Sequence, residues 1–525
     1  MSYIQPLTAE YHQYLKDESR TIGSAQTISF PTCEGEVVEI LRKLTADGET
    51  ITIQGARTGV AAGAVPKTGH VMNLSKMKGI TGCTQHGKGF QFTVEPGLSL
   101  LELNKQLATK KMDSTRWSAS FMEAFHRFLD GVPQFYPPDP TESTCSLGGM
   151  VSCNASGARS YLYGSVRNHI SGLRVVLWDG EILDLTRGQV YAQGRTLKLT
   201  TENSKVIYLD LPTYQMPQAK NASGYYVTDD MDAVDLFIGA DGTLGIVTQI
   251  TILTSPLPRE IWGTSCFFQT QDRALDFVES LRGSLENIAA LEYFDPFALD
   301  ILRAQREQGT TFQQLPGIPA DHCHCVYCEI HCATKEAAQS TLFALGDAIQ
   351  AVGGNPSDTW VARNDSDLKT LQFFRHAVPE CTNMIIDNRK KTESVITKLG
   401  SDMSVPDGCL KQVFHLYKST LQAENLEHAI WGHIGNNHLH VNILPRNAEE
   451  FHKGEELFKL WAEETSRMGG AVSAEHGVGK LKSSFLTYMY GSSGIREMVA
   501  LKSALDPHHT LNLGNLFPSQ QEVQP

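Results

Sequence analysis

The pattern of hydrophobic and polar positions predicts alternating helices and strands in the first part of the chain. Apolar residues recur at helical spacing over residues 36–44, and TITIQ at 50–54 has the composition of a buried strand. The segment FQFTVEPG alternates apolar and polar residues, and the helical pattern SLLELNKQLATKK follows it. Residues 118–131 have the pattern of an additional helix. These elements predict a mixed α and β domain.

Beyond this region the pattern becomes rich in strands. SGLRVVLWDGEILDL predicts a hairpin that turns at Asp179–Gly180. Residues 240–258, ADGTLGIVTQITILTSPLP, predict a helix, a turn and a strand that stops at two prolines, which we expect to mark a domain boundary. After it, strands alternate with amphipathic helices. This order predicts an α+β domain whose sheet carries helices on one face.

Length, charge and cysteine content limit the class of protein. A chain of 525 residues is too long for one hydrophobic core, and its net charge of -13 argues against nucleic acid or an anionic membrane as partner. No apolar run reaches the 18 residues of a membrane span, and the polar first 20 residues predict no secretory signal. The odd number of cysteines, 11, favours reduced thiols in the cytoplasm.

The cysteine-rich segment HCHCVYCEIHC, residues 322–332, invites a metal-binding interpretation. Zinc and iron–sulfur sites use paired C-x-x-C loops, which this spacing does not match. Because apolar residues alternate with the cysteines, we favour a strand with buried thiols.

Two glycine-rich segments are candidates for binding a cofactor. The loop GARTGVAAGAVPKTG follows a strand, and its backbone N–H groups suit a pyrophosphate, although a structural turn is equally compatible. The spacing matches neither G-x-G-x-x-G nor the P-loop. The second segment, YPPDPTESTCSLGGMVSCNASGARSYLYG at 136–164, combines prolines, hydroxyl side chains and small residues. Small residues allow a flat ring or a phosphate to approach the backbone closely.

A third candidate is rich in histidine. WGHIGNNHLHVNILP spans residues 431–445, and SAEHGVGK spans 473–480. A metal site, a proton-transfer site and a packed polar network are all compatible with these residues. The glycines on both sides of each motif favour a functional site, because they permit close backbone approach around a bound group.

The order QGARTGVAAGAVP, VEPGLSLLELN, PPDPTESTCSLGGMVSCNASG, YGSVRNHISGLRVVLWDGEIL and GADGTLGIVTQITI is similar to the flavin domain of the vanillyl-alcohol-oxidase/PCMH superfamily. The resemblance implies an α+β fold with a two-subdomain PCMH-type FAD-binding domain over residues 1–258, with its core from about 25. It places pyrophosphate contacts at Arg57, Thr58, Gly59 and Val60, and flavin contacts at Pro138, Asp139, Ser143, Ser146, Gly149, Ser156, Gly157, Ile246 and Val247. Members with covalent flavin often carry a histidine where Gly59 and Val60 stand, so we expect non-covalent FAD.

In the second half, FFRHAVPE, KLGSDMSVP, GHIGNNHLHVN, SAEHGVGK and LNLGN resemble the C-terminal domain of FAD-linked D-2-hydroxyacid dehydrogenases acting on D-lactate, glycolate or D-2-hydroxyglutarate. The resemblance implies a cap domain with an antiparallel sheet over residues 259–500, and a segment at 501–525 that returns to the FAD domain. The implied activity oxidises a D-2-hydroxy acid, D-lactate-like, to the 2-oxo acid. Electrons would pass to a quinone, an electron-transferring flavoprotein or an iron–sulfur subunit.

The same resemblance assigns the site residues. The implied ligands of a divalent ion, Zn²⁺ with Mn²⁺ or Fe²⁺ as alternatives, are His433, His440 and Glu475. The implied base is His476, and the implied substrate-binding residues are Arg375, Lys398 and Asn442.

The chain departs from the family pattern at one point. The family commonly reads G-H-x-G-D-G-N-x-H, whereas this chain has Asn436, Asn437 and His438 in place of Asp, Gly and Asn. His438 is expected near the substrate, with a metal-ligand role or a buried neutral ring left open. Two further functions stay open, a non-redox transferase of the alkylglycerone-phosphate synthase type and a flavoprotein subunit of a larger electron-transfer complex. A homodimer is also compatible.

Overall fold

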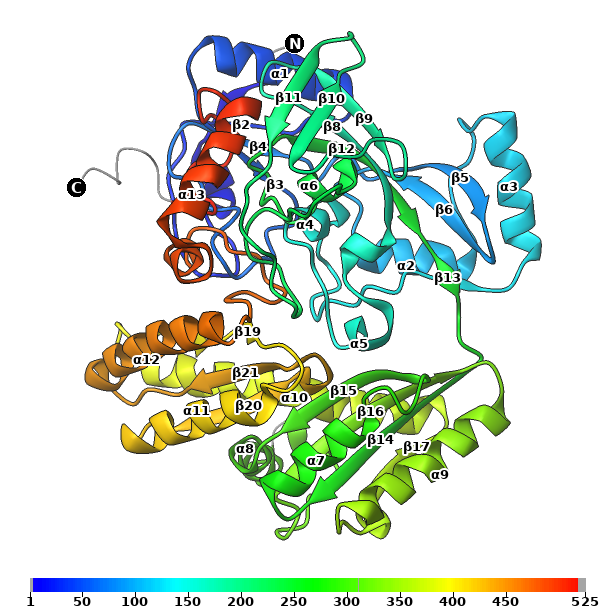
Figure 1. Ribbon diagram of the computed structural model, residues 1–525, viewed down its shortest axis with the longest axis vertical. Helices are drawn as coiled ribbons and strands as arrows, with labels where there is room; N and C mark the ends of the chain where they lie inside the picture. The colour runs from blue at the N-terminus through cyan, green and yellow to red at the C-terminus, as the bar shows by residue number, and fades with distance from the viewer. Residues whose placement is uncertain (1–2, 310, 518–525) are drawn as a thin grey trace.

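The computed structural model describes residues 3–309 and 311–517. Figure 1 shows an upper part, formed by the first half of the chain together with the last helix, and a lower part formed by most of the second half. The chain passes from the upper to the lower part between β13 (Ser255–Pro256) and β14 (Glu260–Phe268). The predicted domain limits at residues 258 and 500 stay predictions, and residues 518–525 lie outside the described part.

The first sheet of the upper part carries the glycine loop. Its order is β1 (Gln5–Pro6), β2 (Thr27–Ser29), β4 (His70–Asn73) and β3 (Ile51–Gln54), and the last three strands are parallel. Helix α1 (Glu34–Ala46) buries Val37, Ile40, Leu41 and Leu44 against this region, so the predicted helical periodicity is confirmed.

A second, antiparallel sheet has the order β5 (Ile80–His86), β6 (Gly89–Val94), β12 (Ile246–Leu253), β8 (Ile170–Val176) and β9 (Ile182–Thr186). The predicted hairpin is β8 and β9, and Gly180 takes a φ of 79° in its turn. The helix predicted at the start of 240–258 is wrong. Helix α6 (Ala233–Phe237) ends earlier, because Asp241 and Gly242 both have positive φ and interrupt any helix there.

Short elements complete the upper part. The helices are α2 (Leu100–Thr109), α3 (Ala119–Asp130), α4 (Leu147–Ser152) and α5 (Ser160–Tyr163), and the strands are β7 (Gln134–Phe135), β10 (Thr196–Thr200) and β11 (Val206–Asp210). The two helices predicted from periodicity at 99–111 and 118–131 are confirmed as α2 and α3.

The lower part is built on one antiparallel sheet. Its order is β17 (Thr359–Ala362), β14, β16 (His324–Cys332), β15 (Ile288–Phe294), β20 (His428–Gly432), β21 (His438–Ile443) and β18 (Leu399–Gly400), and β19 (Met403–Ser404) also pairs with β21. The strand predicted in the cysteine-rich segment is confirmed as β16.

Helices cover both faces of this sheet, so the prediction of helices on one face is wrong. Phe268 on β14 packs against Phe277 of α7 (Gln271–Leu281), while its neighbour Phe267 belongs to the core with Leu299 of α8 (Pro296–Glu307). Helix α9 (Lys335–Ala351) packs into the same core as Phe268 and Phe277, and α10 (Asp365–Lys390) packs into the same core as Phe267 and Leu299. Every residue of β15 and β16 is buried, because side chains on both faces meet a helical layer.

The end of the chain returns to the upper part. After α11 (Leu410–Ala423) and α12 (Ala448–Arg467), helix α13 (Leu486–Leu505) lies in the upper part (Figure 1), where it contacts β11. Leu511 pairs with Ile51 of β3, and the Ile53 amide donates to Asn512 Oδ1 at 2.7 Å. Among the described helices, none combines the length and the apolar composition needed to cross a bilayer.

Candidate active site

A cavity in the upper part is lined by segments that lie far apart in the sequence. They are the glycine loop after β3, the segment before and along α4, the turn before β12, and residues of the SAEHGVGK and LNLGN motifs. Of the predicted FAD contacts, the cavity is lined by Arg57, Thr58, Gly59, Val60, Ser146, Gly149, Ser156 and Val247. The predicted contacts that do not line it are Pro138, Asp139, Ser143, Gly157 and Ile246.

The wall of this cavity leaves polar groups available for a bound molecule. Ser156 Oγ and Arg57 Nη1 are buried and make no hydrogen bond with any described residue. Arg57 has a φ of 62°, and its guanidinium lies 4.0 Å from the ring centroid of Tyr14. Gly55 is tightly packed, since a Cβ there would lie 2.0 Å from Ser146 Oγ. Unpaired donors and a closely approached backbone fit a phosphate-bearing cofactor.

Sequence reasoning missed three residues that close the cavity. Asp241 Oδ2 accepts hydrogen bonds from the amides of Val478 and Gly479 at 3.2 and 2.8 Å. The side chains of Asn512 and Asn515 donate to the Asp241 carbonyl at 2.7 and 3.1 Å. Their motifs, GADGTLG and LNLGN, supported the family resemblance, but only the fold shows that they meet. Burial raises the pKa of Asp241 to about 6, although these amide donors act in the opposite direction.

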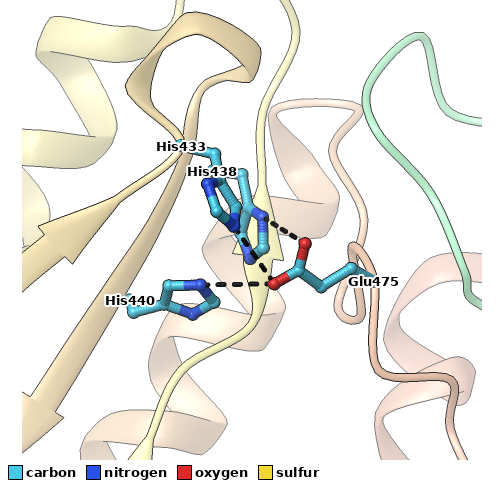
Figure 2. Close-up of side chains that lie close together, drawn as sticks. All are labelled: His433, His438, His440 and Glu475. Atoms are coloured by element: carbon cyan, nitrogen blue, oxygen red, sulfur yellow. Dashed lines mark hydrogen bonds and ion pairs between the residues drawn. The ribbon is translucent and has the colours of Figure 1, made fainter. Parts of the chain in front are cut away.

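Four of the predicted site residues lie together at the junction of the two parts. Nitrogen or oxygen atoms of His433, His438, His440 and Glu475 lie within 4.8 Å of one another (Figure 2). We call these four residues the histidine cluster. His433 lies in the turn between β20 and β21, His438 and His440 lie on β21, and the loop after α12 carries Glu475. Glu475 Oε1 lies 3.3 Å from His433 Nε2 and 3.4 Å from His440 Nε2.

The outer nitrogen of each predicted histidine ligand is held by an acceptor. His433 Nδ1 lies 2.8 Å from Glu292 Oε1, and His440 Nδ1 lies 3.2 Å from the Ser401 carbonyl. Since a carbonyl only accepts, the proton of His440 is on Nδ1, and its Nε2 lone pair faces Glu475. Histidines that bind metals are commonly anchored in this way. The residues present therefore fit a divalent ion.

The electrostatics of the histidine cluster keep Glu475 ionised. Burial favours the neutral acid, but the Lys220 ammonium, 2.8 Å from Oε2, and then His433 hold the pKa of Glu475 well below its usual range. Burial likewise disfavours a charged His433, yet the Glu475 carboxylate outweighs it and raises the pKa of His433 to about 9. A cation that binds here must displace that proton.

His476 links the cavity to the histidine cluster. It lines the cavity together with Glu475, and its side chain is 36% exposed, against 15% or less for the residues of the histidine cluster. Its Nδ1 lies 3.3 Å from Asp402 Oδ2, and its Nε2 lies 3.5 Å from Glu475 Oε1. The Asp402 carboxylate also accepts from the His476 amide at 3.1 Å. Asp402 is a fourth residue whose role sequence reasoning missed.

The predicted substrate-binding residues occupy two places. Arg375 on α10 is largely buried, and its Nε lies 3.3 Å from Glu292 Oε2, so one carboxylate contacts both Arg375 and His433. Lys398 is exposed, and it lies with Asn442 beside Gly400, where a Cβ would be 3.6 Å from Lys398 Cε and 2.9 Å from Asn442 Oδ1. None of the three lines the flavin-side cavity.

Comparison with known families accounts for these two halves of the site. The family of FAD linked oxidases, C-terminal domain, matches residues 257–516, and the FAD binding domain family matches residues 25–121 and 117–186. The chain belongs to the FAD-linked oxidases. In this FAD-linked oxidase the FAD-binding family covers the glycine loop, and the C-terminal family covers the histidine cluster. The predicted FAD cofactor and oxidoreductase class are thereby confirmed.

Two relatives match nearly the whole of this FAD-linked oxidase. The D-2-hydroxyglutarate dehydrogenase of Xanthomonas citri pv. viticola is 26% identical, over 97% of this chain and 93% of the relative. The mitochondrial D-lactate dehydrogenase [cytochrome] of Arabidopsis thaliana is 25% identical, over 95% of this chain and 74% of the relative. The 4-ethylphenol oxidase of Gulosibacter chungangensis shares the fold, with a TM-score of 0.65 and 16% identity over 99% of this chain and 95% of that one. The predicted α+β fold class is confirmed.

Proposed function

We propose that the protein is an FAD-dependent dehydrogenase that oxidises a D-2-hydroxy acid, D-lactate-like, to the 2-oxo acid. The observation that carries the proposal is the position of His476. It lines the cavity of the FAD-binding loops and at the same time contacts the histidine cluster. A base placed there reaches a substrate held between the flavin and a metal ion. The names of the two relatives support this substrate class.

Each of these residues has a proposed role in the reaction. His476 takes the hydroxyl proton of the substrate at Nε2, because Asp402 holds the Nδ1 side of the ring. Arg375 and Lys398 offer positive charge to the substrate carboxylate, and Asn442 offers a hydrogen bond. When bound, FAD supplies the acceptor for the C2 hydride. A divalent ion held by His433, His440 and Glu475 supplies a Lewis acid for the substrate oxygen.

Several details belong to the same proposal. Non-covalent FAD, a divalent ion with Zn²⁺ expected first, and a cytoplasmic location are retained from the sequence. The expected external electron acceptor is a quinone, an electron-transferring flavoprotein or an iron–sulfur subunit. A homodimer is compatible with this arrangement.

The proposal is tested by anaerobic flavin reduction. The purified yellow protein is mixed with both enantiomers of lactate and 2-hydroxyglutarate and with glycolate, and loss of the visible flavin absorbance is followed. We expect D-lactate or a related D-enantiomer to bleach the flavin, and the His476→Ala variant to stay yellow and unreduced. If no 2-hydroxy acid bleaches the wild-type flavin, the proposed function is wrong. If His476→Ala is reduced normally, His476 is not the base.

A further inference from the structure

His438, the residue at which the chain departs from its family pattern, lies inside the histidine cluster. Its side chain is fully buried, and it begins β21, so His438 and His440 share one face of that strand. The ring centroid of His438 lies 5.3 Å from that of His433 and 4.5 Å from that of His440. Figure 2 shows its ring beside His433, with both facing Glu475.

The turn before His438 contains Asn436 and Asn437, which replace the Asp and Gly of the family pattern. Asn437 has a φ of 50°, a left-handed conformation that asparagine tolerates better than most residues. Its side chain donates to Asp407 Oδ1 at 2.9 Å, and Asn436 Oδ1 accepts from Ser160 Oγ at 3.0 Å. The turn is thus held from both parts of the molecule, which places His438 in a defined position.

The two ring nitrogens of His438 have different surroundings. Nε2 lies 2.9 Å from Asp402 Oδ1 and pairs with that carboxylate. Nδ1 makes no hydrogen bond with any described residue and lies 3.9 Å from Glu475 Oε2. A buried ring nitrogen without a partner is unfavourable, unless a bound species supplies one.

His438 therefore repeats the arrangement of the two predicted histidine ligands. In each of the three residues, one ring nitrogen lies against an oxygen acceptor, namely Glu292, Ser401 or Asp402, and the other faces Glu475. Asp402 is itself held as a carboxylate, since it accepts from Lys482 Nζ at 2.6 Å and from Ser473 Oγ at 2.8 Å. An outer carboxylate of this kind leaves the inner nitrogen free to bind a metal.

We propose that His438 is a fourth protein ligand of the divalent ion, bound through Nδ1, so that the centre has three imidazoles and one carboxylate. The inference rests on the proposed function only in that the histidine cluster holds an ion. Four protein ligands complete a tetrahedral shell, whereas a catalytic ion must keep a position for the substrate. The fourth ligand changes the metal expected from the sequence: the centre then suits an ion that accepts five or six ligands, such as Mn²⁺ or Fe²⁺, better than the tetrahedral Zn²⁺ expected first.

The test is a measurement of metal binding that does not depend on turnover. The FAD-loaded protein is freed of metal with a chelator and titrated with Mn²⁺, and unbound Mn²⁺ is counted from its EPR signal. His438→Asn restores the residue of the family pattern and removes the proposed ligand. Loss of an outer-shell partner alone weakens metal binding about 10- to 100-fold, so we expect at least that loss for His438→Asn.

A matched control is His428→Asn. His428 is also buried, lies on the neighbouring strand β20, and has a ring nitrogen without a hydrogen bond, but it is not part of the histidine cluster. It should bind Mn²⁺ as the wild type does. Equal affinity of His438→Asn and the wild type, or an equal loss in both variants, would overturn the proposal.

A second measurement keeps the proposal testable if His438→Asn does not fold. Pulsed EPR of the Mn²⁺-loaded wild type counts the coordinated nitrogens, and we expect three imidazoles. Two imidazoles, or a wild type that binds no Mn²⁺, would refute the assignment. A failure of every 2-hydroxy acid to bleach the flavin would instead refute the proposed function and leave the nitrogen count unaffected.

Discussion

Replacing Glu292 by glutamine should weaken metal binding without touching any predicted ligand. Glu292 lies on β15, and its carboxylate contacts His433 Nδ1 at 2.8 Å and Arg375 Nε at 3.3 Å. Burial would raise the pKa of Glu292, but Arg375 and then His433 outweigh it and lower the pKa to about 2. The residue is therefore a carboxylate at neutral pH. Glutamine keeps its shape and removes the charge that anchors His433.

The expected size of the effect follows from this contact. Loss of an outer-shell partner of a metal-bound histidine weakens metal binding about 10- to 100-fold. At about 1.4 kcal/mol for each tenfold change, this is about 1.4 to 2.8 kcal/mol. The glutamine oxygen can accept a hydrogen bond from either His433 Nδ1 or Arg375 Nε, but the NH₂ group then faces the other donor. We therefore expect slower flavin reduction as well, because Arg375 also loses its carboxylate partner.

The assay is Mn²⁺ titration of the FAD-loaded protein, with Glu329→Gln as the matched control. Glu329 is a buried carboxylate on the adjacent strand β16, paired with Arg159 at 2.6 Å and with His331 at 2.8 Å. Its loss removes the same kind of buried charge but does not touch the histidine cluster. If Glu292→Gln binds Mn²⁺ as tightly as the wild type, or if both variants lose the same affinity, Glu292 does not support metal binding through His433.

Three further predictions concern the cofactor and the stability of the fold. Gly157→Ala should purify with less FAD than Gly346→Ala. A Cβ at Gly157 would lie 2.0 Å from the Asp139 carbonyl oxygen, whereas a Cβ at Gly346 would meet no atom within 4 Å. Equal flavin content in the two variants would contradict this prediction. Acid precipitation of the wild type should leave a colourless pellet, and a yellow pellet would mean covalent flavin. Burial lowers the pKa of His70 to about 4, so its contribution to stability is full above pH 6.5 and is lost as the pH falls toward 4. Between pH 7 and 4.5 the wild type should lose about 2.5 kcal/mol more unfolding free energy in urea than His70→Asn, and equal losses would exclude this linkage.

Much of the local structure could be predicted from the sequence because it depends on neighbours in the chain. The 3.6-residue spacing predicted α1, α2 and α3, and alternation predicted β6 and β16. The helix predicted before β12 failed for a local reason, the positive φ of Asp241 and Gly242. The covering of both faces of the lower sheet was missed because a fully apolar strand does not show which helix will cover each of its faces.

For the site, the sequence by itself determined the residue types and the family, and hence the FAD cofactor and the class of chemistry. The tertiary structure alone decided which side chains contact these histidines. Glu292 contacts His433 because β15 pairs with β20, although about 140 residues separate them. Asp402 contacts His438 because β19 pairs with β21, and it contacts His476 because Ser404 of β19 also pairs with Ala471, in the segment that leads to His476. Periodicity and motifs depend on neighbours along the chain, whereas these contacts depend on which strands pair across the sheet.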